Sequence, residues 1–236
     1  VYAAYVRWLR RERPAHAASR QRVGDIIVYC HEYGTGEPVL LLHGGFMFAE
    51  TWAGQIPALS RRFRVIAMDS RGHGRTTLGD GPLTYRRLAG DAAGLLTSLG
   101  IDGAHVVGWS DGGCAALALA LERPALVRSM VLLGTPYHTD NYSEEARRRI
   151  EDTLRPSSLS MLGLRAVRRL LTDEPRRGGE FLEKMSAMWR GLPDFTPEEM
   201  GRVAAPTLVI GCDRDEFLSP REDPLRVFEE TAAAIP

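Results

Sequence analysis

A serine between glycines is the feature of this sequence that most directly suggests chemistry. Residues 108–112 read Gly-Trp-Ser-Asp-Gly, which is the pattern G-x-S-x-G with Ser110 at its centre. An apolar segment precedes the pattern and an alanine-rich segment follows it, so we expect a tight turn from a strand into a helix. Such a turn exposes the Ser110 hydroxyl beside a helix N-terminus, which favours a nucleophilic role over simple helix capping.

A second glycine-rich turn could supply N–H groups to a negatively charged reaction intermediate. The residues His43-Gly44-Gly45-Phe46 directly follow the apolar residues 39–42. We expect the amides of Gly45 and Asp111 to form an oxyanion hole, with Phe46 as the less favoured donor. His43 could act as a base, but a histidine at such a turn more often bonds the loop backbone, which is the interpretation we favour.

The residues around Ser110 also suggest how a substrate is held. We expect Phe46, Trp109 and Asp111 to contact it. The carboxylate of Asp111 could have two roles, and the sequence does not favour either one. It could attract an ammonium group of the substrate, or it could complement the positive end of its own helix. Asp213 and Asp215 follow a late apolar segment, where a carboxylate could accept the Nδ1–H of a catalytic histidine.

Strand-like and helix-like segments alternate through the first 135 residues. The expected strands are 26–33, 39–42, 64–68, 104–109 and 127–133, and the expected helices are 50–61, 84–99 and 111–121. This order predicts an α/β fold, in which a mostly parallel sheet carries helices on both faces.

The later part of the chain breaks this rhythm. Residues 136–203 carry helical signals and no strand signal, whereas 206–210 reads as another strand and 222–234 as a helix. We therefore expect a helical cap at 136–203 over the carboxyl edge of the sheet, between a first core part at 1–135 and a second at 204–236. Peripheral helices packed on one face are the alternative.

Composition narrows the classes of partner. The 236 residues include 30 basic and 30 acidic side chains, so no overall field attracts nucleic acid or an anionic membrane, and a small-molecule partner is expected. The arginines bunch in places such as 165–169, which we interpret as solvated helix faces or loops. No apolar run is long enough to span a bilayer, and the three cysteines suggest no disulfide framework, which favours a cytoplasmic protein. The oligomeric state stays open.

Four motifs together resemble the α/β-hydrolase superfamily. They are the turn at 43–45, the stretch Asp-Ser-Arg-Gly-His-Gly-Arg at 69–75, the Gly-Trp-Ser-Asp-Gly-Gly turn at 108–113, and the segment 207–215. Ser-Asp-Gly-Gly and the Asp-Arg-Asp-Glu-Phe at 213–217 are most similar to the biphenyl-hydrolase-like or valacyclovir-hydrolase-like serine esterases. The resemblance implies a nucleophile at Ser110, the acid at Asp215 rather than Asp213, and hydrolysis of carboxylic esters or related small acyl compounds through an acyl-enzyme. It implies neither a metal nor a cofactor.

The catalytic base that the resemblance requires is missing. In this superfamily the histidine follows the acid, whereas no histidine follows His138 here. Because the chain begins with Val1 and stops before the expected last strand, we interpret it as a fragment whose natural gene continues with a strand and a loop histidine. The rival hypothesis is a catalytically silent α/β-hydrolase-fold protein that binds a ligand without turning it over.

Overall fold

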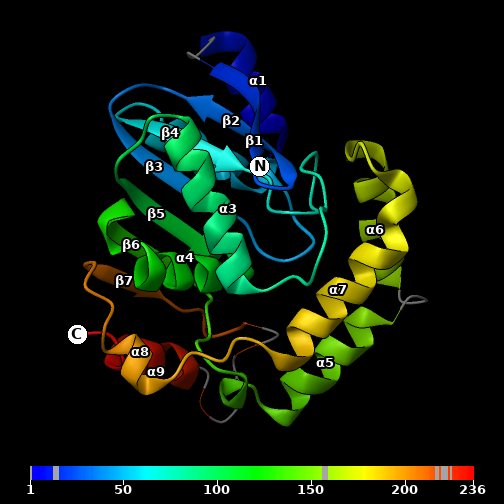
Figure 1. Ribbon diagram of the computed structural model, residues 1–236, viewed down its shortest axis with the longest axis vertical. Helices are drawn as coiled ribbons and strands as arrows, with labels where there is room; N and C mark the ends of the chain where they lie inside the picture. The colour runs from blue at the N-terminus through cyan, green and yellow to red at the C-terminus, as the bar shows by residue number, and fades with distance from the viewer. Residues whose placement is uncertain (1, 13–15, 156–158, 216–217, 219–222, 224) are drawn as a thin grey trace.

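A seven-stranded sheet forms the centre of the computed structural model, which describes residues 2–12, 16–155, 159–215, 218, 223 and 225–236 (Figure 1). Its strands lie in the order β1-β2-β4-β3-β5-β6-β7. Their bounds are β1 His16–Val23, β2 Ile26–Tyr33, β3 Glu37–Leu42, β4 Phe63–Met68, β5 Ala104–Trp109, β6 Val127–Leu133 and β7 Thr207–Ile210.

The pairing confirms the predicted mostly parallel sheet. β3 pairs in parallel with β4 and β5, and β6 pairs in parallel with β5 and β7, whereas β1 and β2 are antiparallel to their neighbours. The carboxyl ends of β3, β5, β6 and β7 therefore lie along one edge of the sheet, where ligands of such folds bind. β1 was not predicted, since it is a polar strand at the sheet edge that is exposed along most of its length.

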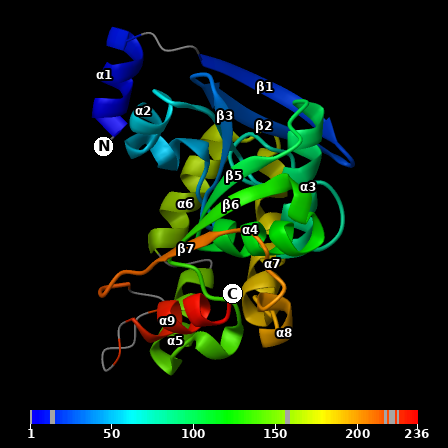
Figure 2. The same cartoon turned by 90° about the vertical axis from the view of Figure 1, so that its left-hand side faces the viewer.

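Helices cover both faces of the sheet, as predicted. One apolar core joins the sheet to α3 (Tyr85–Ser98) and α4 (Asp111–Glu122), and a second core on the other face takes in α1 (Tyr2–Glu12) and α2 (Ile56–Leu59). Figure 2 shows these two layers on opposite sides of the strands. The single helix predicted at 50–61 is instead a 3-10 turn, Ala49–Gly54, followed by α2, because Pro57 in the first turn of α2 has no N–H to continue a helix from the preceding turn.

The segment between β6 and β7 is helical in the part that the structure describes. It contains α5 (Glu144–Leu154), α6 (Leu159–Leu171), α7 (Gly178–Gly191) and α8 (Pro197–Met200), and we refer to residues 136–203 as the helical segment. α5, α6 and α7 lie together outside the layers of the sheet (Figures 1 and 2). After β7 comes α9 (Arg226–Ala233), so part of the helix predicted at 222–234 lies outside the described residues. None of the described helices has the length and apolarity needed to cross a membrane.

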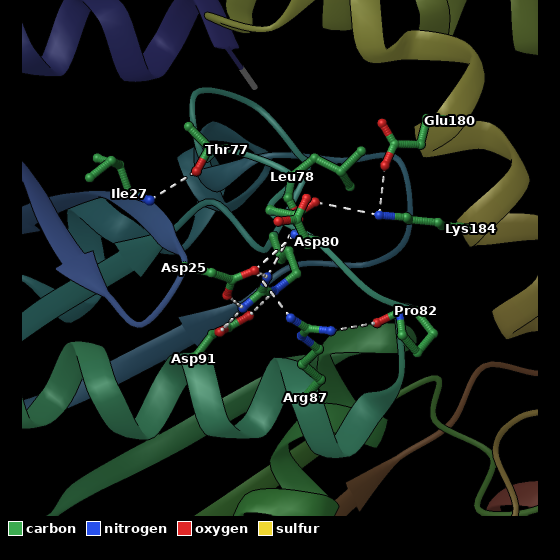
Figure 3. Close-up of polar contacts among 12 residues, drawn as sticks. Asp25, Ile27, Thr77, Leu78, Asp80, Pro82, Arg87, Asp91, Glu180 and Lys184 are labelled. Carbon is green, nitrogen blue, oxygen red and sulfur yellow. Dashed lines mark hydrogen bonds and ion pairs between the residues drawn. The ribbon is translucent and has the colours of Figure 1, made fainter.

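A buried ion pair between Arg71 and Asp91 holds the long loop after β4, and Figure 3 shows Asp91, Asp25 and Arg87 beside this loop. The Arg71 guanidinium donates two hydrogen bonds of 2.8 and 2.7 Å to the Asp91 carboxylate and a third of 2.9 Å to Asp25. Arg87 reaches the same Asp25 carboxylate at 3.1 Å. Lys184 of α7 lies 3.4 Å from the carbonyl oxygen of Gly79 in this loop, so the loop also contacts the helical segment.

Candidate active site

Ser110 sits on a strained turn between β5 and α4. Its φ of 53° and ψ of −118° are unusual for a residue with a side chain, and its N–H is held by the Leu133 carbonyl at 2.9 Å. The two flanking glycines are required by close backbone approaches. A Cβ on Gly112 would lie 2.1 Å from the Leu42 carbonyl oxygen, and a Cβ on Gly108 would lie 2.4 Å from that of Gly112. The G-x-S-x-G pattern thus reflects the space available around this turn.

The turn after β3 faces Ser110. A Cβ on Gly44 would already be 3.4 Å from the Cβ of Ser110, and a Cβ on Gly45 would be 2.4 Å from the Asp111 carboxylate. The amide of Asp111 lies at the first position of α4, where a helix offers no acceptor of its own and carries its partial positive charge. The structure therefore brings Gly45, Ser110 and Asp111 together at the N-terminus of α4.

The Phe46 amide is occupied elsewhere. Its N–H donates to Nε2 of His73 at 3.0 Å, and Phe46 adopts a left-handed φ of 61°. Nδ1 of His73 lies 3.0 Å from the Arg71 carbonyl oxygen, to which it donates because Nε2 is the acceptor. Burial lowers the pKa of His73 well below its usual value, so the ring is neutral and positions the loop of Phe46. This geometry agrees with the expectation that Phe46 is the less favoured oxyanion donor.

His43 also serves the loop backbone, as expected. Its Nδ1 lies 2.8 Å from the Gly44 carbonyl oxygen, and its Nε2 accepts the Ser70 N–H at 3.0 Å. Burial lowers its pKa, which keeps the ring neutral. With both ring nitrogens bonded to the backbone, His43 is not placed to take a proton from Ser110.

A cavity of about 290 Å³ opens in front of Ser110, and we call it the catalytic cavity. Its lining includes all of the residues predicted for the site: Gly45, Phe46, Trp109, Ser110, Asp111 and Asp215. The helical segment adds Tyr142, Ile150 and Trp189, which the sequence did not single out. No local pattern marks these three, because an apolar or aromatic side chain in such a segment usually indicates core packing.

Asp215 and Asp213 differ in their surroundings. Asp215 lines the catalytic cavity, and its Oδ2 lies 3.3 Å from the position of a Cβ on Gly134 at the end of β6. Its Oδ1 accepts the Leu218 N–H at 2.9 Å. Asp213 is exposed and is not among the lining residues. The structure thus brings Asp215, and not Asp213, to the same cavity as Ser110.

The Asp111 carboxylate links the core to the helical segment. Oδ1 accepts the Tyr85 hydroxyl of α3 and Oδ2 accepts the indole N–H of Trp189 on α7, each at 2.8 Å. Burial raises the pKa of Asp111 to about 6, although both hydrogen bonds favour the charged form. Tyr85 and Trp189 were not identified from the sequence as partners of Asp111, since they lie 26 and 78 residues away from it along the chain.

None of the six histidines lines the catalytic cavity, and the structure describes all six. His105 lies between Glu37 and Ser129 at the opposite end of the strands, while His138 caps the 3-10 turn at Thr139–Asn141. His16 and His31 stack on one another near Glu50. The group that would take the proton of Ser110 is therefore not found among the histidines of this sequence.

Comparison with known proteins identifies the family. The model of the alpha/beta hydrolase fold matches residues 37–161, which run from β3 into the helical segment and include the Ser110 turn. This match covers more than half of the chain, so the protein belongs to the α/β-hydrolase fold family.

Several curated relatives are hydrolases, and their names give different substrates. The chain is 30% identical over 205 residues to the 2-hydroxy-6-oxo-6-(2'-aminophenyl)hexa-2,4-dienoic acid hydrolase of Metapseudomonas resinovorans, a match that covers 79% of this chain and 71% of that protein. It is 36% identical over 130 residues to a putative carbamate hydrolase, RutD, of Azorhizobium caulinodans, covering 54% of this chain. The chain spans only 49% of the length of that RutD.

Solved structures show the same architecture. A meta-cleavage product hydrolase from Pseudomonas fluorescens superposes with a TM-score of 0.73 at 26% identity, covering 92% of this chain and 86% of that one. A thermophilic esterase from Thermogutta terrifontis gives a TM-score of 0.69 at 27% identity, covering 93% and 87%. These likenesses support the α/β-hydrolase fold of this chain.

Proposed function

We propose that the protein is a serine hydrolase that cleaves carboxylic esters or related small acyl compounds through an acyl-enzyme. One observation carries the proposal: Ser110 occupies a strained turn at the N-terminus of α4, in one cavity with Gly45, Asp111 and Asp215. Relatives of the chain cleave other bonds, according to their names, while the esterase from Thermogutta terrifontis supports the choice of an ester.

The chemistry assigns a role to each group. Ser110 Oγ attacks the carbonyl carbon of the ester, and the amides of Gly45 and Asp111 stabilise the oxyanion that forms. Collapse of this intermediate expels the alcohol and leaves an acyl group on Ser110, which water then removes. Asp215 orients a histidine base that takes the Ser110 proton and returns it to the leaving alcohol. No histidine of these 236 residues fills that place, so the proposal requires a base from outside them.

We further propose that residues 136–203 act as a cap over the site. Tyr142, Ile150 and Trp189 of this segment line the catalytic cavity, and Trp189 bonds the Asp111 carboxylate. Together with Phe46 and Trp109 they provide a mostly apolar wall for the acyl or alcohol part of a substrate. The core would then comprise residues 1–135 and 204–236.

The second candidate function is ligand binding without turnover. The observation that favours it is the cavity around Ser110 that no histidine of the sequence lines. Such a protein would bind an ester and release it unchanged, whereas the proposed hydrolase transfers the acyl group to Ser110.

Acylation of Ser110 separates the two functions. We expect the product of the natural gene to release a burst of p-nitrophenol from p-nitrophenyl butyrate and to carry a butyryl group on the peptide that contains Ser110. Ser110→Ala should abolish both signals, while Ser98→Ala, at the end of α3, leaves them intact. Absence of a burst and of an adduct, with the ester still bound, would establish the silent alternative.

The 236-residue chain by itself provides a further check on the base. Without a histidine in the cavity, Ser110 is a poor nucleophile, and loss of one triad member costs on the order of a million-fold in kcat. We expect this chain to hydrolyse p-nitrophenyl butyrate at a rate that barely exceeds the background. Turnover at the rate of the natural gene product would show that the mechanism needs no histidine.

A further inference from the structure

A second cavity of about 360 Å³ adjoins the catalytic cavity, and its charged lining residues are basic. It lies between the loop at 46–48, residues 73–74, α6 and the start of α7. Four arginines line it, and the described lining residues include no acidic side chain: Arg165, Arg168, Arg169 and Arg176. We call it the arginine cavity. Phe46 and Met47 line both cavities and so form a shared wall.

Only some of the hydrogen-bond donors of Arg168 have acceptors. Its Nε donates to the Gly72 carbonyl at 3.0 Å, and its Nη1 lies at 3.5 Å from the Glu174 carbonyl. Its Nη2 is buried and has no partner among the described residues. A buried donor without an acceptor is unfavourable, and an acceptor supplied by a ligand would relieve it.

The other three arginines leave the cavity with uncompensated charge. Arg165, Arg169 and Arg176 are exposed, and within the part of the chain that the structure describes they form no ion pair. Nearby cations are paired by contrast: Arg177 bonds Glu174 and Glu180, and Lys184 bonds Glu180 (Figure 3 shows the last pair). A concave site that is lined by cations and has low-dielectric walls attracts an anion.

The apolar walls of the arginine cavity indicate that the bound anion also carries carbon groups. Phe46 and Phe181 meet edge to face at 5.6 Å between ring centroids, and Arg168 stands 4.7 Å over the Phe181 ring. Leu171 and Leu182 add further apolar surface. Carbon groups gain from such a surface, whereas an inorganic anion does not. The combination suits an organic acid whose carboxylate meets the planar guanidinium donors.

We propose that the arginine cavity binds the carboxylate of a small organic acid, with Arg168 as its principal partner and Arg165, Arg169 and Arg176 at its rim. The carboxylate has two possible sources. It belongs to the substrate, whose ester then lies across the Phe46 wall beside Ser110, or to a separate acid. The first source rests on the proposed function, and the second does not.

Calorimetry with glutarate tests the site without requiring turnover. We expect the wild-type protein to bind glutarate, with an affinity that falls as salt is added. Arg168→Gln should weaken binding by roughly 10- to 150-fold, the range for loss of a charged hydrogen bond. The exposed pair Arg165→Gln with Arg169→Gln should weaken it by about 2- to 10-fold.

The matched control is Arg22→Gln, which removes the same charge from an exposed position on β1 and should leave binding unchanged. If Arg168→Gln fails to fold, as a lower melting temperature would show, the exposed double variant decides the question. No binding by the wild type, or equal binding by the cavity variants and Arg22→Gln, overturns the proposal.

A pair of esters with one leaving group identifies the source. p-Nitrophenyl hydrogen adipate carries a free carboxylate, and its methyl ester does not. This comparison uses the product of the natural gene. If the substrate supplies the carboxylate, that protein prefers the anionic ester, and Arg168→Gln in the same protein loses the preference without losing activity on the methyl ester. Binding of glutarate without such a preference supports a separate acid. Failure to hydrolyse either ester counts against the proposed function alone, because the calorimetric result stands independently.

Discussion

Replacing Asp111 by Asn should make the protein more stable near neutral pH, relative to its stability in acid. The ordinary pKa of an aspartate, 3.8, rises to about 6 here because the carboxyl is buried between Tyr85 and Trp189. Between about pH 4 and 6 the folded state keeps a proton that the unfolded state has lost, so a rise in pH favours unfolding. Asn can still accept the Trp189 N–H and donate to the Tyr85 oxygen.

The size of the effect follows from the change in pKa. One pKa unit corresponds to about 1.4 kcal/mol, so the wild type loses about 3 kcal/mol in total on passing from strong acid to pH 7, and about 2 kcal/mol of this between pH 4 and 7. Over that interval the free energy of unfolding of Asp111→Asn should rise by about 2 kcal/mol relative to the wild type, because all other titrating groups cancel in the difference.

Urea unfolding at a series of pH values measures this difference. Asp102→Asn, in an exposed loop, is the matched control. Its free energy of unfolding should change with pH in the same way as that of the wild type. The m-values need to agree, so that the comparison reflects stability and not a change in the unfolded state. Parallel curves for Asp111→Asn and the wild type would mean that Asp111 is charged down to its ordinary pKa, which would refute the account of its burial.

Three further outcomes are expected. Above pH 6 the charged Asp111 should favour an α-amino ester over its neutral analogue with the same leaving group, and Asp111→Asn should lower kcat/KM of the amino ester alone by roughly 10 to 150-fold in the natural gene product; equal losses would assign the carboxylate to its helix. Gly112→Ala should cost at least about 2 kcal/mol of stability because its Cβ meets backbone at 2.1 Å, while Gly90→Ala, with open space on α3, should add about 1 kcal/mol, both read from urea midpoints. Asp91→Asn should cost about 1.5 to 3 kcal/mol, because the buried Arg71 guanidinium keeps Asp25 but loses the charge of its buried partner. Asp173→Asn, in an exposed ion pair, should cost under about 1 kcal/mol, and similar losses would contradict the role of burial.

The sheet could be predicted largely from the sequence because its central strands are rich in apolar residues. β5 and β6 begin and end where the sequence analysis placed them, and β2 does so as well. β1 carries no such signal. Its residues alternate between exposed and half-buried positions at an edge, so its pairing with β2 depends on a partner that its own composition does not reveal.

In the candidate site, too, features that depend on neighbouring residues could be predicted, whereas contacts between distant residues could not. The Ser110 turn could be predicted because its glycines and the adjoining strand and helix lie within a few residues of one another. The partners of Asp111 could not, since α3 and α7 meet the carboxylate only after the chain has folded. Arg168 was predicted to lie on a solvated face with its neighbours. It is instead half-buried over Phe181, a difference that helical spacing alone does not decide.

Phe46 connects these features, because together with Met47 it separates the two cavities, one with the Asp111 and Asp215 carboxylates and the other with four arginines. Its amide is fixed by His73 and its ring lies edge to face with Trp189, which bonds Asp111, and with Phe181, which lies under Arg168. A carboxylate would be repelled on the Asp111 side at neutral pH and attracted on the arginine side. A substrate with a carboxylate would therefore be oriented by the two sides together, with its ester toward Ser110 and its charge beyond Phe46.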